Sequence, residues 1–310
     1  MLNTISYLIT SALRMGTPIA ITALGGCYSE KSGIINFGLE GIMVVGAFLG
    51  VIGSSISGSA WVGVLFAMIG GLLFALIHAV VTVTFGGNQS ASSLALIVTA
   101  QGAASLATAY MFGLAGKSDY VNNLPTTEIF RNIPLVGNFL ADLTPFVYIG
   151  IILVIVLNYV LYKTPFGLRI ITCGEHPETA DTAGVNVNRI RYICILMSGA
   201  LGGLGGATLS LGLLNLYSND MVAGRGFLAI VAVIIGQWTP FGSFLASMVF
   251  GLFMSLQIYI QILPNNPVPS HIVQIIPYFL SVIVFVLTVS KKPVNPTALG
   301  KPLDKFDRSI

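Results

Sequence analysis

Polar residues that could handle a solute gather in one short stretch, Ser29–Gly41, between two long apolar runs. The stretch carries Glu30, Lys31, Asn36 and Glu40. Asn36 and Glu40 stand four positions apart, so a helix through them would place both side chains on one face. A carboxylate inside a membrane needs a hydrogen-bond partner or water, and it is a candidate for a solute pathway. We therefore expect Asn36 and Glu40 to face a translocation route; the alternative is a buried hydrogen bond from Glu40 to a neighbouring helix.

Uncharged amides form a second group of candidates. Asn88 and Gln89 open the fourth apolar run, and Gln101 lies within it. Amides suit a neutral solute that forms hydrogen bonds, and they serve equally well in hydrogen bonds between helices. All three are therefore candidate pathway residues. Glu30 and Lys31 are expected in water at the membrane surface, with a place on the pathway as the alternative for Glu30.

One arginine stands in a glycine-bearing polar stretch before the shortest apolar run. Arg225 is flanked by Gly224 and Gly226. An arginine at that depth needs a partner or water. We expect a structural role for Arg225 at a re-entrant turn, and the alternatives are an ion pair with Asp220 or attraction of an external protein.

Motifs for catalysis and nucleotide binding are missing from this sequence. Gly116-Lys-Ser118 resembles the end of a phosphate-binding loop, but Met111 stands where that loop needs its first glycine. No nucleophile stands at a recognisable spacing from a base. We expect neither an enzyme nor a metal or cofactor site in this chain. The histidines are interpreted as incidental and the cysteines as small packing residues, since none has the spacing of metal ligands: His78, His176, His271, Cys27, Cys173 and Cys194.

The composition is that of a membrane protein. Of the 310 residues, 55% are hydrophobic and 8% are charged, whereas about a quarter of the residues of a soluble domain are charged. The net charge of +3 is too small to indicate nucleic-acid binding. The first apolar run begins at Ile5 without a basic leading region, so we interpret it as a retained helix.

The apolar runs predict an all-α, polytopic bundle of about nine membrane spans. A spanning helix needs about 20 apolar residues, and the runs lack the alternation of a membrane barrel. The ninth run, Phe227–Trp238, is short. Residues 1–290 would form the transmembrane domain and residues 291–310 a cytoplasmic tail. The eight longer runs are Ile5–Leu24, Ile34–Ile56, Trp61–Phe85, Ser92–Leu114, Phe146–Tyr162, Ile190–Leu213, Phe241–Ile262 and Ile272–Val289.

Lysine and arginine in the loops predict the orientation. If residues 163–191 are cytoplasmic, span counting places the loop Gly25–Gly33 and the carboxyl tail on the same side. That side then holds ten of the 14 basic residues: one in the first loop, four in 163–191 and five in the tail. The opposite side keeps Lys117, Arg131 and Arg225. The amino terminus is therefore predicted outside and the carboxyl terminus inside.

The loop 163–191 is the one substantial polar segment on the predicted cytoplasmic side. Its residues from Pro177 to Ala183 predict a short helix, with proline in the first turn and Gly184 as the stop. Such a helix suits docking of a soluble partner, and a solvated connector is the alternative. Glycine pairs at Gly199/Gly203 and Gly202/Gly206 predict close helix packing in the following span.

Three segments resemble signatures of the nucleoside and simple-sugar permeases of bacterial ATP-binding-cassette (ABC) importers, within the branched-chain amino acid/ribose-type permease superfamily. Ser29–Gly41 is similar to the family's Ser-Glu-Arg/Lys-Ser-Gly-x-x-Asn-x-Gly-x-Glu-Gly loop. Gly174–Val187 is similar to its cytoplasmic Gly-Glu-x-Pro-x-x-Ala-x-x-Ala-Gly-Ile/Val-Asn-Val loop. Met221–Ala229 is similar to its Met-x-Ala-Gly-Arg-Gly-Phe-x-Ala segment. The resemblance covers essentially the whole chain.

The resemblance implies a short permease subunit of an ATP-driven importer in a bacterial cell membrane, because the family's longer members carry an extra amino-terminal span. It implies three partners: a second homologous permease, a cytoplasmic ATPase that binds the ATP, and an external solute-binding lipoprotein. The solute would be a nucleoside in preference to a pentose or hexose. The short helix would be the coupling helix that sits in a cleft of the ATPase, with its contact residues at Glu175, Pro177, Glu178, Ala180, Asp181, Ala183 and Gly184.

The competing hypothesis is an ion-coupled secondary transporter of a small neutral solute, with Glu30 or Glu40 as the titrating group. Such transporters have two halves with interrupted helices in matching positions. The sequence has one interrupted region and a large polar loop, which favours the permease.

Overall fold

The computed structural model describes residues 2–113, 116–125, 141–262, 269–289 and 295–301. Its regular structure within those ranges is helical, apart from one isolated bridge between Lys117 and Ser218, so the predicted all-α class is confirmed. The helices in chain order are α1 (Leu2–Lys31), α2 (Leu39–Ser57), α3 (Ala60–Ala79), η1 (Val80–Thr84), α4 (Gln89–Phe112), α6 (Pro145–Lys163), α7 (Pro165–Glu175), α8 (Pro177–Thr182), α9 (Val187–Leu209), η3 (Ser210–Leu214), α10 (Arg225–Ile235), α11 (Pro240–Ile262) and α12 (Ser270–Val289).

Seven of the described helical segments are long and apolar enough to cross a membrane. They are α1, α2, α3 with η1, α4, α6, α9 with η3, and α11. The 11 residues of α10 extend about 16 Å, which is half the thickness of a bilayer core. The described apolar part of α12, Ile272–Val286, is also shorter. The expected total of nine crossings therefore stays a prediction.

The first helix is longer than the sequence predicts. Helix α1 continues to Lys31, and α2 begins at Leu39 instead of Ile34, so the predicted loop Gly25–Gly33 is wrong. The helix continues through Gly25, and the missing side chain of this glycine lets α9 approach closely. A Cβ at Gly25 would lie 2.9 Å from the Cα of Ser198. In a membrane, such glycines serve helix packing.

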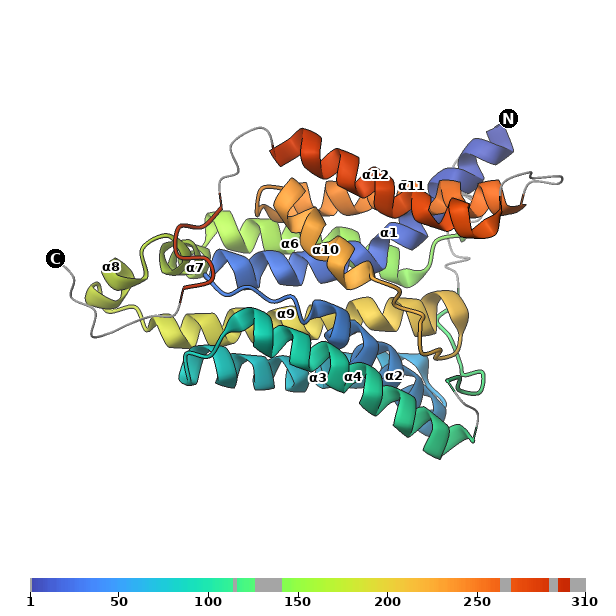
Figure 1. The fold of residues 1–310 in the computed structure, drawn as a ribbon, viewed down its shortest axis with the longest axis horizontal. Helices are drawn as coiled ribbons and strands as arrows, with labels where there is room; N and C mark the ends of the chain where they lie inside the picture. The colour runs from blue at the N-terminus through green and yellow to red at the C-terminus, as the bar shows by residue number, and fades with distance from the viewer. Residues whose placement is uncertain (1, 114–115, 126–140, 263–268, 290–294, 302–310) are drawn as a thin grey trace.

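Helix α9 forms the centre of the packing (Figure 1). A Cβ added to Gly203 would lie 2.2 Å from the carbonyl oxygen of Ala67 in α3, and one added to Gly206 would lie 2.1 Å from that of Met43 in α2. Gly205 faces α1 in the same way, at 2.1 Å from Oγ1 of Thr22. The close packing predicted from the glycine pairs is confirmed, because α9 touches three helices at backbone distance.

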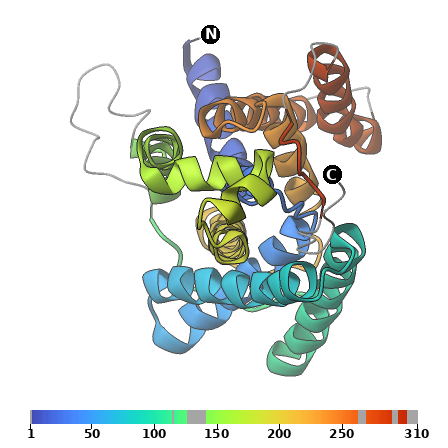
Figure 2. The same ribbon diagram turned by 90° about the vertical axis from the view of Figure 1, so that its left-hand side faces the viewer.

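Helices α1 and α11 run antiparallel. The hydroxyl of Ser255, near the end of α11, donates to the carbonyl oxygen of Leu8, near the start of α1 (3.0 Å). At the opposite end lie α7, α8 and residues 295–301; we call this the α8 end of the bundle. Helices α4, α10 and α12 lie along one face, which is turned to the viewer in Figure 1 and to the right in Figure 2.

The described part of the carboxyl tail joins two other segments at the α8 end. The backbone N–H of Ala298 donates to Gly174 (2.9 Å), and that of Gly300 donates to Gly33 (3.0 Å). The N–H and hydroxyl of Thr297 both donate to Oε2 of Glu175. The basic residues used to predict orientation include several that lie outside the described residues: Arg131, Lys291, Lys292, Lys305 and Arg308.

Candidate substrate pathway and coupling surface

Glu40 is the most completely bound of the predicted pathway residues. It is the second residue of α2 and is 4% exposed. Its Oε1 accepts from the N–H of Gly224 (2.8 Å) and its Oε2 from that of Gly226 (2.7 Å). These donors belong to the first turn of α10, whose N–H groups have no partner within the helix and whose dipole favours a negative charge. The carboxylate therefore anchors the start of α10.

The geometry at Glu40 matches the hydrogen-bond alternative and leaves little room for change. A Cβ added to Gly226 would lie 2.4 Å from the Cα of Glu40.

Asn36 does not share a helical face with Glu40, so that prediction is wrong. Asn36 lies in the non-helical segment 32–38, after the left-handed residue Gly33 (φ 96°). Its Nδ2 donates to Oγ of Ser198 (3.0 Å), and the side chain is 1% exposed.

Glu30 anchors the other end of α10. Its Oε2 accepts from Nε1 of Trp238 (2.5 Å), and both side chains are buried, so the expectation that Glu30 lies in water is wrong. The tryptophan follows the end of α10 in a tight turn where Gln237 and Trp238 have positive φ angles of 54° and 53°. Non-glycine residues adopt that region only where surrounding contacts enforce it. The two carboxylates that flank segment 32–38 therefore hold both ends of one short helix.

Arg225 binds the backbone of the turn before α10. Its Nη1 donates to the carbonyl oxygens of Met221 (2.8 Å) and Val222 (3.1 Å). These bonds close the turn that leads into α10. The partners of Arg225 are thus backbone carbonyls and not the carboxylate of Asp220.

The amides predicted on the pathway have different surroundings. Oδ1 of Asn88 accepts from the N–H of Ala91 (2.9 Å) and caps α4. Oε1 of Gln89 accepts from the N–H of Ile35 (2.7 Å). Gln101 is exposed on α4. Asn88 and Gln89 therefore support the local fold. Gln89 is buried, whereas Asn88 and Gln101 are exposed, and of these two Asn88 is used as a helix cap.

His78 is a structural bridge, so its interpretation as incidental is wrong. The ring is fully buried, with Nδ1 3.0 Å from Oγ of Ser92 and Nε2 3.1 Å from the carbonyl oxygen of Ile35. It joins α3, α4 and segment 32–38. Its partners lie 14 and 43 positions away along the chain, and a single histidine in an apolar run gives no signal for either.

The short helix predicted near Pro177 is present as α8. It has proline in its first turn, and the chain turns at Gly184 (φ 84°). Four of the predicted coupling residues are exposed: Glu178, Asp181, Ala183 and Gly184. A cavity of about 510 Å³ lies beside them, with Arg169 and Arg189 among its lining residues. This surface is open to a partner.

Two predicted coupling residues contact other parts of this chain. Ala180 is 4% exposed and packs in the hydrophobic core with Cys173 and Val187, so its predicted contact with a partner is wrong. Glu175 binds Thr297, as described above, and Pro177 is half-buried. The cysteines are buried and free, as expected. Burial raises the pKa of the Cys173 thiol to about 11, so it stays protonated and unreactive near neutral pH.

Comparison with known proteins decides the family. The family model described as the permease component of branched-chain amino acid transport systems matches residues 8–289. The chain belongs to this permease family. The predicted resemblance is thereby confirmed, and the chain is a multi-pass component of a transport system in the cell membrane, with no enzyme activity of its own.

The names of three relatives of the permease mention a solute. It is 36% identical over 310 residues to the nucleoside ABC transporter permease protein NupC of Lactococcus lactis, covering 96% of each chain. It is 35% identical over 314 residues to the guanosine ABC transporter permease protein NupQ of Bacillus subtilis, covering 98% of each. The putative glucose ABC transporter permease protein TsgC13 of Haloferax volcanii is 31% identical over 84% of this chain and 81% of its own. No solved structure matches the permease significantly.

The three signature segments of the permease meet in space. Glu40 links Ser29–Gly41 to Met221–Ala229 through its bonds to the start of α10. Gly174–Val187 reaches the first segment directly, because a Cβ on Gly174 would lie 2.1 Å from the carbonyl oxygen of Lys31. Segments far apart in sequence therefore form one continuous path from α8 to α10.

Proposed function

We propose that this permease carries a nucleoside across the cell membrane as one subunit of an ATP-driven ABC importer. The observation that carries the proposal is the identity of 35–36% over nearly full length to relatives named for nucleoside and guanosine. The putative glucose permease is less similar and is matched over a shorter part.

The proposed topology has nine crossings, with the amino terminus outside and the α8 end in the cytoplasm. Segment 215–224 and α10 would together make one crossing, since α10 alone extends about half of the apolar thickness. The antiparallel course of α1 and α11 supports this arrangement. Residues 1–290 then form the transmembrane domain, with the coupling loop 163–191 and the tail 291–310 inside.

The partners proposed are a second homologous permease, a cytoplasmic ATPase and an external solute-binding lipoprotein. Helix α8 would dock on the ATPase through Glu178, Asp181, Ala183 and Gly184, which this chain leaves uncovered in its described part. ATP would be bound and hydrolysed in that separate subunit. Arg169 and Arg189 in the neighbouring cavity favour an acidic contact surface on the ATPase.

Uptake by whole cells tests this function. Cells that lack this permease should lose uptake of labelled guanosine at low external concentration and regain it from a plasmid copy, whereas uptake of ribose and glucose should not change. Unchanged guanosine uptake, or loss of sugar uptake alone, would contradict the proposed solute. Nucleoside transport by the purified chain alone in vesicles without an ATPase would contradict the proposed energy source.

A further inference from the structure

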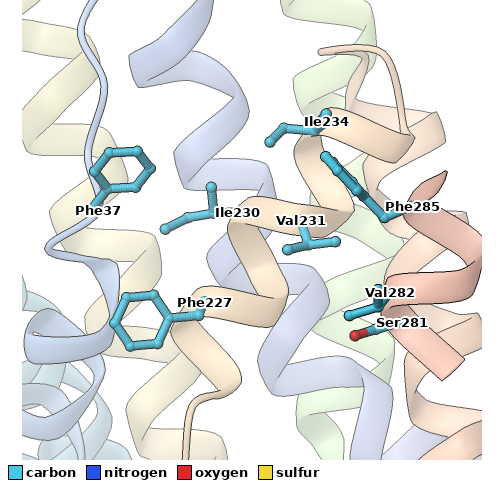
Figure 3. A pocket seen from close by; sticks show the side chains of 8 residues that line it. All are labelled: Phe37, Phe227, Ile230, Val231, Ile234, Ser281, Val282 and Phe285. Carbon is cyan, nitrogen blue, oxygen red and sulfur yellow. The ribbon is translucent and has the colours of Figure 1, made fainter. Parts of the chain in front are cut away.

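An apolar groove of about 300 Å³ lies on the face formed by α4, α10 and α12. Three aromatic rings line it: Phe37 from segment 32–38, Phe227 from α10 and Phe285 from α12. Figure 3 shows α10 between the segment that carries Phe37 and the helix that carries Phe285, with Phe227 below Phe37. Two of the three signature segments thus contribute a ring to the same groove.

Hydrogen bonds fix these segments relative to one another. Phe37 follows Asn36, whose side chain is bound to Ser198. Phe227 follows Gly226, whose N–H is held by Glu40. Helix α12 is tied to the turn before α10, because the hydroxyl of Tyr278 donates to the carbonyl oxygen of Ala223 (2.5 Å). The rings therefore come from segments with set positions, which reduces the ordering needed when a solute binds.

The lining suits a flat, uncharged, aromatic solute. Among the described residues no charged side chain lines the groove, and the hydroxyl of Ser281 is already used in a bond to the carbonyl oxygen of Tyr278 (2.6 Å). A free sugar would leave several hydroxyls without partners there. A nucleobase presents two π faces, which stack on phenylalanine rings without regard to its identity. The volume is at the small end for ligand pockets.

We propose that this groove is a transit site for the base of the nucleoside, with Phe37 and Phe227 as its stacking contacts and Phe285 facing them from α12. The inference rests on the proposed function, since it concerns how the same solute is recognised. It also gives the buried polar residues of Ser29–Gly41 a different part: Asn36 and Glu40 position the two segments that carry the rings. The solute contacts are then the phenylalanines.

Leucine substitutions in the complete transporter test the stacking contacts. Phe37→Leu and Phe227→Leu keep apolar bulk but remove the ring, and each should lower nucleoside uptake per assembled complex about ten-fold, in line with the contribution of one base–aromatic stack. Phe227→Tyr keeps a ring and should retain uptake within about two-fold of wild type. Phe279→Leu is the matched control, because Phe279 is 62% exposed on α12 and does not line the groove; its uptake should match wild type.

Photolabelling adds a readout that does not depend on turnover. With 8-azidoguanosine as the probe, labelled peptides from the purified complex should contain Phe227 or Phe285, and excess unlabelled guanosine should prevent the labelling. Ribose at the same concentration should not prevent it.

The outcomes separate this inference from the proposed function. If wild-type cells take up no nucleoside, the proposed function fails, and the inference fails with it. If wild-type uptake is normal and both leucine variants equal it, the inference alone is overturned, and the groove holds a lipid chain. If the leucine variants reduce the amount of assembled complex while uptake per complex is normal, the groove holds a helix of the second permease, and the inference is likewise overturned.

Discussion

The two ends of α10 are each held by a buried carboxylate, but by different chemistry. At the start of the helix, Glu40 accepts two bonds from backbone N–H groups. At the end, Glu30 accepts one bond from the side chain of Trp238. Backbone donors are present whatever the side chain, so the first end depends on Glu40 and on glycine at 226. The second end depends on a pair of side chains that can be exchanged separately.

Glu40→Ala should have the largest effect. It removes two hydrogen bonds to a charged acceptor, each of which contributes about 1.5–3 kcal/mol, so a loss of about 3–6 kcal/mol in stability is expected. Thermal unfolding of the detergent-solubilised complex would measure it. Glu40→Gln keeps one acceptor and should lose about half as much. Normal assembly of Glu40→Gln with an altered solute preference would contradict the anchoring role and place Glu40 in contact with the solute.

Gly226→Ala should have the next largest effect, because the new methyl group would meet the backbone of Glu40 at 2.4 Å. Overpacking of this kind typically removes about 1–3 kcal/mol. Gly102→Ala in α4 is a matched control, since a Cβ there has no neighbour within 4 Å, and helix propensity favours alanine. Complex yield after solubilisation measures both. Equal yields from the two variants would show that the start of α10 tolerates displacement.

Trp238→Phe tests the other end and should have a smaller effect, about 1–3 kcal/mol, from one unpaired carboxylate oxygen. Combining it with Glu30→Gln completes a double-mutant cycle, in which the coupling should be about 0.5–3 kcal/mol. A coupling of zero would mean that the bond contributes nothing to the hold on α10. Thermal unfolding of the four proteins gives the answer.

Glu178→Arg should have the smallest effect on stability, because Glu178 is exposed on α8 and an exposed side chain loses little packing when it is exchanged. It should nevertheless reduce nucleoside uptake severely, since charge reversal on a docking surface removes much of a modest interface. Glu178→Gln is the milder control and should keep most of the uptake. Unchanged uptake by the arginine variant, at normal complex yield, would place the ATPase contact elsewhere.

The sequence predicts the elements of this fold better than their junctions. Long apolar runs and paired glycines locate the spanning helices and the packing of α9, because both signals are local. The end of α1 is not local: Glu30 is polar and was expected in water, but its partner Trp238 lies 208 positions away. The role of His78 is hidden for the same reason. Asn36 does not lie on the predicted helical face, because the chain turns at the left-handed residue Gly33 and the next helix begins only at Leu39. The amino-acid pattern alone does not specify that turn.

Residues 295–301 of the tail connect two segments at the α8 end of the bundle. They fasten Gly174 and Glu175 of α7 to Gly33, with bonds on both sides. Arg191 of α9 adds a further hydrogen bond, from its Nε to the carbonyl oxygen of Ser32 (3.2 Å). These bonds connect α7, which leads into α8, and the start of α9 to segment 32–38. A tag fused after residue 301 would lie close to these hydrogen-bonded residues and could disturb them. A long linker is therefore the safer choice for labelled versions of the protein.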